Sequence, residues 1–296
     1  MGPCRGESLA RRIVRPIAVL GATAAEVEPL RVALGKPAPE QRAGFDIWQG
    51  QIGDTEVVLV RSGPGKVWAA AAAQLALDRF QPRCLLMTGA CGSLDPAVGV
   101  GDVLLGERLV PHDLAWITGG GDVRDGVPYT DAEGHTFRLA SLVADPALVA
   151  HAARAASALH LPAREADGRS RRALPATIAS GDQFIASAAK RRWLRETFGA
   201  LGCEREGLAA AQVALAHGVP FLLVKGASDA ADETIDADPA RLVLWEDQHA
   251  LDQAYRRLAA GEILPTPIGD GLRASFRYAA ANAARVVEGI VLALGA

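Results

Sequence analysis

Several carboxylates stand beside strongly apolar segments and could carry out acid–base chemistry. Glu26 follows the first apolar run, Glu204 and Glu206 lie where a short strand should end, and Asp229 follows the apolar run 219–224. Open α/β sheets place their ligand sites at the carboxyl ends of strands. A partly buried carboxyl group at such a place can have a raised pKa and donate a proton. Asp229 is therefore the first candidate for a catalytic acid.

Each of these acids also has a purely structural interpretation. Glu26 lies in the first turns of an expected helix, where a glutamate is commonly just solvated. Asp229 could cap a helix through its side-chain oxygen. For Asp232, a role as a cap or a structural partner is favoured over catalysis.

Two stretches rich in glycine and small residues are expected to form loops next to these acids. They are 62–66 and 88–93, and each follows a strand candidate. Glycine lets backbone N–H groups approach a ligand closely, and a helix N-terminus favours anions. Neither stretch matches a phosphate-binding or dinucleotide-binding fingerprint. Tight turns demanded by a compact sheet remain the alternative interpretation.

Other familiar site types find little support in the sequence. The six histidines are scattered without metal-ligand spacing, although His112 and Asp113 could form a charge pair near the mouth of a site. Ser180 and Ser228 lack the Gly-x-Ser-x-Gly setting of a serine hydrolase. We therefore expect neither a metal nor a cofactor.

The amino-acid composition and net charge argue against some classes of binding partner. The chain has 296 residues and a formal net charge of −3, which argues against nucleic acid or a membrane surface as a partner. No secretory signal is readable at the start, and no apolar run reaches the length of a membrane span. The four cysteines show no paired spacing. These features favour a cytoplasmic protein with reduced thiols.

Alternating strand and helix patterns predict an α/β fold. We expect one three-layer α/β/α sandwich with a central mixed, twisted sheet over residues 14–296, preceded by a flexible extension at 1–13. The expected strands are 17–21, 45–50, 56–61, 84–87, one starting at 101, 176–179 and 219–224. The expected helices are 24–34, 67–80, 146–159, 190–198, 206–217 and 272–294, the last burying Phe276, Val287 and Val291.

Two segments differ in amino-acid composition from the rest of the chain. Residues 115–140 are rich in glycine and aspartate, which is typical of an exposed excursion or a lid. Residues 233–270 are polar and broken by proline, with a helix expected around 245–258.

Several short motifs, taken in order, resemble the nucleoside phosphorylase/nucleosidase superfamily, and most of all its methylthioadenosine/S-adenosylhomocysteine nucleosidases. The likeness runs from about Ile17 to Asp232, with the last helix also in place. The motifs are Gly21–Val27, Ser62–Val67, Thr88–Pro96 with Val100–Val103, Ser180–Ile185, Glu204–Gly207 and Ser228–Asp232.

The resemblance implies a division of labour among the acids. Asp229 would protonate N7 of a purine and so make it a leaving group, with Ser228 orienting the acid. Glu206 would hold the 2′- and 3′-hydroxyls of the ribose, and Glu26 would position and deprotonate the attacking water. Carboxylates near the sugar suit a reaction that passes through a cationic ribosyl species.

The remaining substrate-binding residues are also implied by the resemblance. Phe184 would stack on the base while the backbone around Gln183 and Ile185 reads its edge. Glu204 would support the site. The small residues Ala90, Cys91 and Gly92 complete the expected substrate-binding set, together with Arg205 and Ser228.

The likeness favours water over phosphate as the nucleophile. Phosphorylases of the superfamily carry an arginine just before the third motif, where this chain has Met87, and further arginines near the first, where it has Thr23 and Ala24. A retained Glu26 would repel phosphate. A phosphate-dependent phosphorylase and a catalytically inactive nucleoside-binding protein are the alternatives.

Three departures concern the substrate. Arg205 stands where the family usually has methionine; it could bind an anion, or pair with Glu204 and point away. Ala90 replaces a serine, and Pro64 replaces an apolar residue near the 5′ side. The resemblance also implies a homodimer or a larger homo-oligomer.

Overall fold

The computed structural model describes residues 15–131, 133–164, 168–235 and 269–295. The expected extension at 1–13 and the expected helix at 245–258 lie outside these ranges, and the single domain over 14–296 stays a prediction. The helices are α1 (Ala24–Ala33), α2 (Lys66–Phe80), α3 (Pro146–Ser157), α4 (Ala188–Phe198), α5 (Gly207–Ala216) and α7 (Asp270–Gly295). The strands of the main sheet are β1 (Ile17–Gly21), β2 (Glu40–Arg42), β3 (Phe45–Ile52), β4 (Thr55–Arg61), β5 (Cys84–Ser93), β6 (Val103–Pro111), β11 (Leu142–Val143), β12 (Ala173–Ser180), β13 (Gly202–Glu204) and β14 (Phe221–Asp229).

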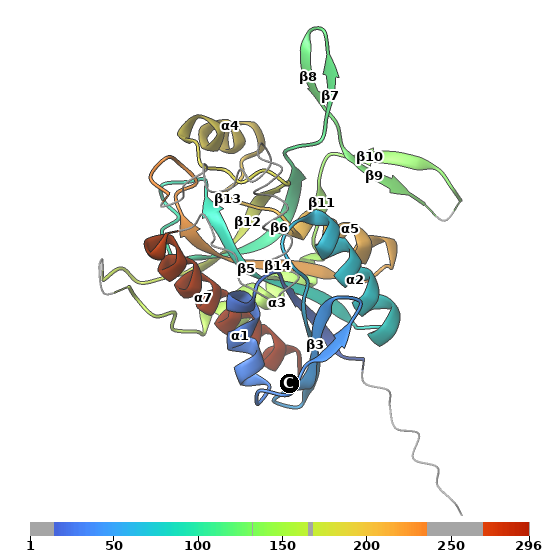
Figure 1. Ribbon diagram of the computed structural model, residues 1–296, viewed down its shortest axis with the longest axis vertical. Helices are drawn as coiled ribbons and strands as arrows, with labels where there is room; N and C mark the ends of the chain where they lie inside the picture. The colour runs from blue at the N-terminus through green and yellow to red at the C-terminus, as the bar shows by residue number, and fades with distance from the viewer. Residues whose placement is uncertain (1–14, 132, 165–167, 236–268, 296) are drawn as a thin grey trace, which may run out of the picture.

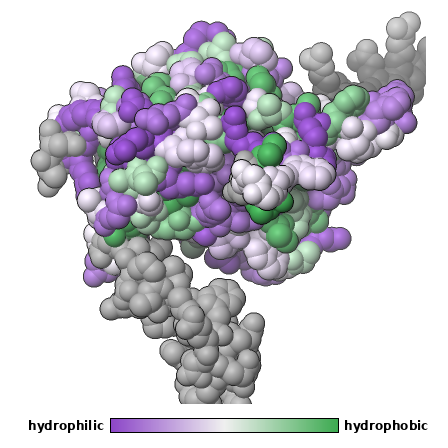
Figure 2. Space-filling view, turned by 90° about the horizontal axis from the view of Figure 1, so that it is seen from above, coloured by the Kyte–Doolittle hydropathy of each residue, from purple (hydrophilic) through white to green (hydrophobic). Residues whose placement is uncertain are grey.

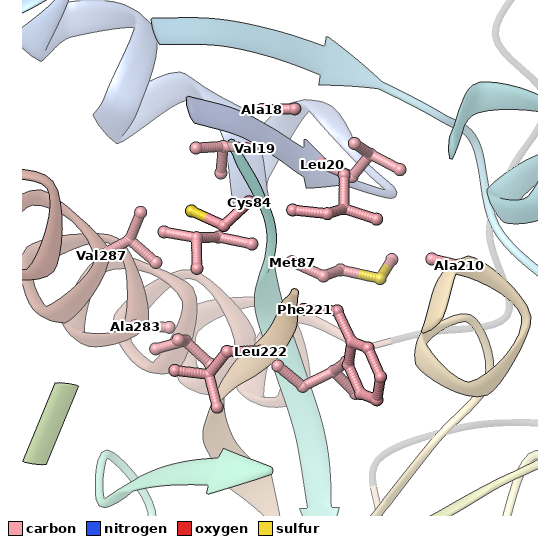
Figure 3. Packing of buried hydrophobic residues seen from close by; sticks show 14 of the residues in the cluster. Ala18, Val19, Leu20, Cys84, Met87, Ala210, Phe221, Leu222, Ala283 and Val287 are labelled. Atoms are coloured by element: carbon pink, nitrogen blue, oxygen red, sulfur yellow. The ribbon is translucent and has the colours of Figure 1, made fainter. Parts of the chain in front are cut away.

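The predicted α/β architecture with a mixed central sheet is confirmed. Helices α1, α3 and α7 pack together on one side of the sheet, and α2 packs with α5 on the other (Figure 1). Between them lie apolar side chains of β1, β5 and β14, with α7 residues on one side and Ala210 of α5 on the other (Figure 3). Val287 and Val291 are fully buried, as expected, whereas Phe276 is only half-buried.

Strand pairing forms a closed ring at one end of the sheet. Strand β5 pairs with β14, β14 with β6, β6 with β12, β12 with β13, and β13 again with β5. The other edge continues from β5 through β1, β4 and β3 to β2. Strand β5 therefore exchanges its neighbour β1, which pairs with it as far as Met87, for β13, which pairs with it at Gly92 and Ser93. Such a switch in strand order is where α/β sheets open a crevice.

The stretch 88–93 was expected to be a loop, and this was wrong. It continues β5, because Thr88 to Gly92 pair with β14 all the way to Asp229. Small residues allow this crowded pairing. A Cβ at Gly89, whose φ is +147°, would collide with Glu26 Oε1. The glycine thus provides room for a buried carboxylate.

Residues 115–140 form two hairpins that project from the body (Figure 1). They are β7 (Ala115–Thr118) with β8 (Gly121–Arg124), and β9 (Val127–Thr130) with β10 (Thr136–Leu139). Most of this excursion is exposed, as expected, but Val127 is fully buried in the main core. The face seen in Figure 2 mixes hydrophilic residues with scattered hydrophobic ones, as on a surface in contact with water.

Helix α7 is long and apolar enough to cross a membrane by length and composition alone. Half of its apolar window is buried inside the protein, however, and it packs against β14 and β5. The packing is close, because a Cβ on Gly226 of β14 would collide with the backbone of Ala279. We therefore assign α7 as a core helix.

Candidate active site

A cavity of about 400 Å³ opens where β5 exchanges its neighbours. Every residue that the sequence analysis proposed for the site lines it. They are Glu26, Ala90, Cys91, Gly92, Gln183, Phe184, Ile185, Glu204, Arg205, Glu206, Ser228 and Asp229. The four acids among them, Glu26, Glu204, Glu206 and Asp229, are called here the carboxylate floor. None of the described residues of the 115–140 hairpins lines this cavity, so their predicted role as a lid finds no support among the lining residues.

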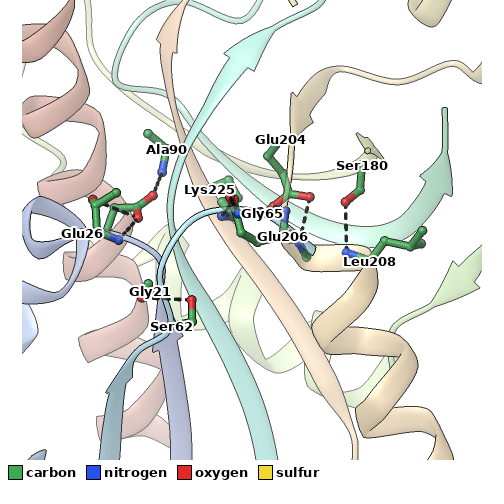
Figure 4. Close-up of polar contacts among 12 residues, drawn as sticks. Gly21, Glu26, Ser62, Gly65, Ala90, Ser180, Glu204, Glu206, Leu208 and Lys225 are labelled. Atoms are coloured by element: carbon green, nitrogen blue, oxygen red, sulfur yellow. Dashed lines mark hydrogen bonds and ion pairs between the residues drawn. The ribbon is translucent and has the colours of Figure 1, made fainter. Parts of the chain in front are cut away.

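Glu26 is buried, so its interpretation as a solvated surface residue was wrong. Its side chain is 2% exposed and turns back to the start of α1. Oε2 accepts from the backbone N–H of Thr23 at 2.8 Å and from its hydroxyl at 3.1 Å. Oε1 accepts from the backbone N–H of Ala90 at 3.0 Å (Figure 4). The carboxylate is therefore fixed between the first turn of α1 and β5.

Glu204 and Glu206 surround the N-terminus of α5. Glu204 accepts from the backbone N–H of Gly207 at 2.8 and 3.0 Å and from that of Glu206 at 3.1 Å. Glu206 accepts from Gly65 N–H at 2.8 Å, which ties α5 to the loop before α2. The positive end of a helix stabilises carboxylates placed this way. These bonds hold both side chains at the cavity (Figure 4).

Lys225 is the fully buried counter-charge of this group, and the sequence analysis assigned it no role. Its Nζ lies 3.2 Å from Glu204 Oε2 and 3.8 Å from Glu206 Oε2. Burial alone would lower the pKa of Lys225, but Glu204, Glu206 and Glu26 outweigh it and raise that pKa. Lys225 directly follows the apolar residues 221–224 of β14, and this position could have identified it from the sequence. A charged side chain that continues a buried strand needs a partner of opposite charge.

Burial raises the pKa of Glu206 above its usual range. Lys225 opposes this shift, while Glu204 and Glu26 reinforce it. Glu206 is thus an acid whose ionised form depends on Lys225. An ionised carboxylate here could accept hydrogen bonds from sugar hydroxyls and stabilise positive charge on the sugar.

Asp229 lies at the last position of β14 beside Ser228. Burial raises the pKa of Asp229, and the hydrogen bonds from Ser228 and the backbone of Ala231 only partly offset this. Ser228 Oγ lies 2.6 Å from Asp229 Oδ2 and 3.1 Å from the carbonyl oxygen of Cys91. Because that carbonyl can only accept, the Ser228 hydroxyl has an acceptor whether Asp229 is ionised or protonated. This arrangement suits an acid that stores and releases a proton.

The segment after β12 forms another part of the cavity. Phe184 is 48% exposed and so presents an open aromatic face, whereas Ile185 is buried. The segment is held by an ion-pair network in which Lys66 Nζ lies 2.7 Å from Asp113 and 3.5 Å from Asp182. A charge pair between His112 and Asp113 was one possibility, but Asp113 pairs with Lys66. Burial lowers the pKa of His112.

Arg205 does not pair with Glu204, whose carboxylate is occupied by Lys225 and backbone N–H groups. Its guanidinium carbon lies 5.9 Å from the centre of the Phe184 ring, and the residue lines the cavity. The interpretation in which Arg205 points away, paired with Glu204, was therefore wrong.

Helix α7 adds a wall that the sequence analysis did not foresee. Its residues at the cavity are Leu272, Arg273, Phe276 and Arg277. They lie on one face of the helix, since positions three and four apart are neighbours on a helix surface. Thr23 and Pro64 also line the cavity. Only the fold brings α7 to the ends of β5 and β14.

A family model described as the Phosphorylase superfamily matches residues 16–260 of this chain. A 5′-methylthioadenosine/S-adenosylhomocysteine nucleosidase from Geobacillus kaustophilus is 35% identical over 217 residues, which cover 73% of this chain and 85% of that protein. The protein with the same name from Shewanella pealeana is 29% identical over 225 residues, covering 75% and 90%.

Solved structures agree with this likeness. A 5′-methylthioadenosine/S-adenosylhomocysteine nucleosidase from Neisseria meningitidis, in complex with methylthio-immucillin-A, is 26% identical with a TM-score of 0.67, covering 94% of this chain and 98% of that chain. Futalosine hydrolase of Helicobacter pylori is 22% identical with a TM-score of 0.66, covering 94% and 97%, and shares the fold.

Proposed function

Because the chain belongs to the phosphorylase superfamily, we propose that it is a nucleosidase that hydrolyses the N-glycosidic bond of a purine nucleoside. The family resemblance inferred from the motifs is thereby confirmed. The products are a free base, for which adenine is the first candidate, and a ribosyl sugar. The observation that carries the proposal is the pairing of a buried acid of raised pKa, Asp229, with a separately fixed carboxylate, Glu26, around one cavity.

In the proposed mechanism, Asp229 gives its proton to N7 of the base as the bond to C1′ lengthens. The bonding electrons leave with the base, and positive charge develops on the sugar. Glu206 holds the ribose 2′- and 3′-hydroxyls and stabilises that charge, since a fixed carboxylate beside a developing cation lowers the barrier. Phe184 stacks on the base, and the backbone around Gln183 and Ile185 reads its edge.

Water then attacks C1′ while Glu26 takes its proton. Glu26 is suited to this step because its two oxygens are oriented by Thr23 and Ala90, so the carboxylate cannot rotate away. The same bonds argue against phosphate as the nucleophile. The donors at the start of α1 that could bind a phosphate already hold Glu26, and a second anion beside it would be repelled.

The supporting residues keep this floor in place. Glu204 binds the amides at the start of α5, and Lys225 balances its charge. Ser228 keeps Asp229 oriented in either protonation state. The small residues Ala90, Cys91 and Gly92 leave room for the base and sugar.

The test is base release with and without phosphate. Purified protein would be incubated with 5′-deoxyadenosine, methylthioadenosine and inosine, and free base would be measured by liquid chromatography. We expect adenine release at the same rate with and without added phosphate. Release only when phosphate is added would replace the hydrolase with a phosphorylase, and binding without release would favour an inactive nucleoside-binding protein.

A homodimer or larger homo-oligomer and a cytoplasmic location complete the proposal. Both rest on likeness to the family and on composition. Multi-angle light scattering of the full chain would measure the oligomer, and a monomer at micromolar concentration would contradict it.

A further inference from the structure

Three arginines line the cavity in addition to the carboxylate floor. Arg205 comes from the turn between β13 and α5, and Arg273 and Arg277 come from the first turns of α7. They are called here the cationic wall. Arg273 and Arg277 are exposed and stand four residues apart, so they share one helix face with Phe276 between them in sequence.

The cationic wall is short of partners among the residues that the structure describes. Arg273 has Asp270 of its own helix at 3.5 Å, but that carboxylate is fully exposed to solvent. Arg205 contacts the Phe184 ring and, within the described ranges, no carboxylate. Arg277 has no ion pair or hydrogen bond within those ranges either. A ligand could therefore supply the missing negative charge.

The carboxylate floor cannot neutralise this wall, because its charges are already satisfied. Glu204 and Glu206 share Lys225, and Glu26 is held by hydrogen-bond donors of the protein. Asp229 is bound by Ser228 and the backbone of Ala231. Within the described ranges, the cavity thus combines fixed acids at its floor with three wall arginines whose one carboxylate partner, Asp270, is exposed to solvent.

The proposed function indicates which part of a nucleoside meets the wall. The base faces Asp229 and Phe184, the ribose 2′- and 3′-hydroxyls face Glu206, and C1′ faces Glu26. Only the 5′ carbon and its substituent are left to reach the first turns of α7. A neutral substituent there would partly remove the arginines from water without giving them a partner, which is unfavourable.

Resting on the proposed function, we propose that the substrate carries a negatively charged 5′ substituent, a carboxylate or a phosphate, bound by Arg273 and Arg277, with Arg205 as a further cation of the same cavity. Guanidinium groups bind both anions through paired N–H donors. The apolar surfaces of Leu272 and Phe276 would cover the chain that links the anion to the sugar.

The test compares nucleosides with charged and uncharged 5′ substituents, of which the carboxylate and the carboxamide are matched in shape. The probes are an adenosine with a 5′-carboxyalkylthio group, its uncharged carboxamide, and adenosine 5′-monophosphate. We expect the kcat/KM of adenine release to be at least about tenfold higher for an anionic probe than for the carboxamide, because hydrogen bonds to charged groups are the stronger kind. The anionic probe with the higher kcat/KM shows whether the site prefers a carboxylate or a phosphate.

Substitutions in the cationic wall test whether its arginines cause the preference for an anionic probe. In Arg277→Gln and Arg273→Gln the ratio of kcat/KM for the anionic probe to kcat/KM for the carboxamide should fall severalfold. Arg285→Gln is the control, since Arg285 is an exposed arginine of the same helix that does not line the cavity. These positions are exposed, so the variants should fold, and circular dichroism would check this.

Equal rates for the charged and uncharged probes, or a preference that survives both substitutions, would overturn the inference. Failure to release base from any probe would instead contradict the proposed function. In that case calorimetry would measure binding of the carboxylate and the carboxamide to the native chain and to Arg277→Gln. Tighter binding of the carboxylate by the native chain, lost in the variant, would support the anion site. Equal binding of the two probes would overturn it.

Discussion

The carboxylate floor and the cationic wall face the same cavity but differ in how the protein holds them. Each floor carboxylate has hydrogen-bond donors or a buried ammonium group within the chain, and none needs a ligand to be oriented. The wall arginines extend from the turn after β13 and from α7 without comparable partners in the described ranges. Groups fixed in advance suit chemistry, because their orientation is not lost at each turnover. Groups without partners suit recognition, because the ligand completes them.

The largest expected effect comes from removing Asp229, the proposed proton donor of the carboxylate floor. In Asp229→Asn the side chain keeps its shape but has no proton to give to the base, so kcat should fall by about 10³-fold, within the usual range for a general acid. Binding of a nucleoside should change little. Single-turnover base release and calorimetric binding measure the two effects separately; a mild loss of kcat would remove Asp229 from the chemistry.

Removing the floor's counter-charge should damage stability as well as activity. Lys225→Met leaves Glu204 and Glu206 buried without their ammonium partner, which should cost about 3–5 kcal/mol in the free energy of unfolding. Denaturant unfolding of both proteins measures the cost. Arg285→Gln, which alters an exposed arginine away from the cavity, should be nearly neutral. A fully stable Lys225→Met protein would contradict the assigned role.

The pH dependence of kcat/KM should report the two floor acids with raised pKa values. Burial raises the pKa of Asp229, so its protonated form persists to higher pH than in an ordinary aspartate, and activity falls as pH rises through that pKa. Burial also raises the pKa of Glu206, so activity falls as pH drops through a pKa above that of an ordinary glutamate. A bell-shaped profile is expected. A profile flat between pH 4 and 9, roughly the span over which such groups titrate, would contradict this pair.

The smallest effect should come from Ser228→Ala. The Ser228 hydrogen bond lowers the pKa of Asp229, so its removal should raise that pKa and move the alkaline limb of the profile to higher pH. Loss of orientation should reduce kcat by about tenfold or less, as one neutral hydrogen bond contributes roughly 1 kcal/mol. An alkaline limb that moves to lower pH would reverse the proposed sign.

Much of the floor could be predicted because its residues follow strands in short, ordered motifs. The family resemblance placed Asp229 and Glu206 in one site; the rule for parallel strand ends could not, because β14 runs parallel to β5 whereas β13 runs antiparallel to it. The stretch 88–93 was wrongly predicted as a loop, because glycine and alanine are typical of loops. Here these small residues let β5 pair with β14 and β13. Small residues mark close approach of backbones as well as turns.

The wall could not be predicted because it depends on contacts between segments distant in sequence. Arg273 and Arg277 read as ordinary surface positions of an amphipathic helix, and only the packing of α7 on β14 and β5 brings them to the cavity. Lys225 could have been found, since a lysine within an apolar strand needs a buried counter-charge. The acids that supply this counter-charge, Glu204 and Glu206, were both predicted as site residues from the sequence.

The source of the oxygen on the sugar product tests the central claim most directly. The full-length protein would cleave methylthioadenosine in ¹⁸O-labelled water containing phosphate, and mass spectrometry would locate the label. The proposed mechanism, in which Glu26 activates water, predicts one ¹⁸O atom on C1 of the sugar and no sugar phosphate. The donors that could bind phosphate already hold Glu26. An unlabelled sugar 1-phosphate as the product would contradict it.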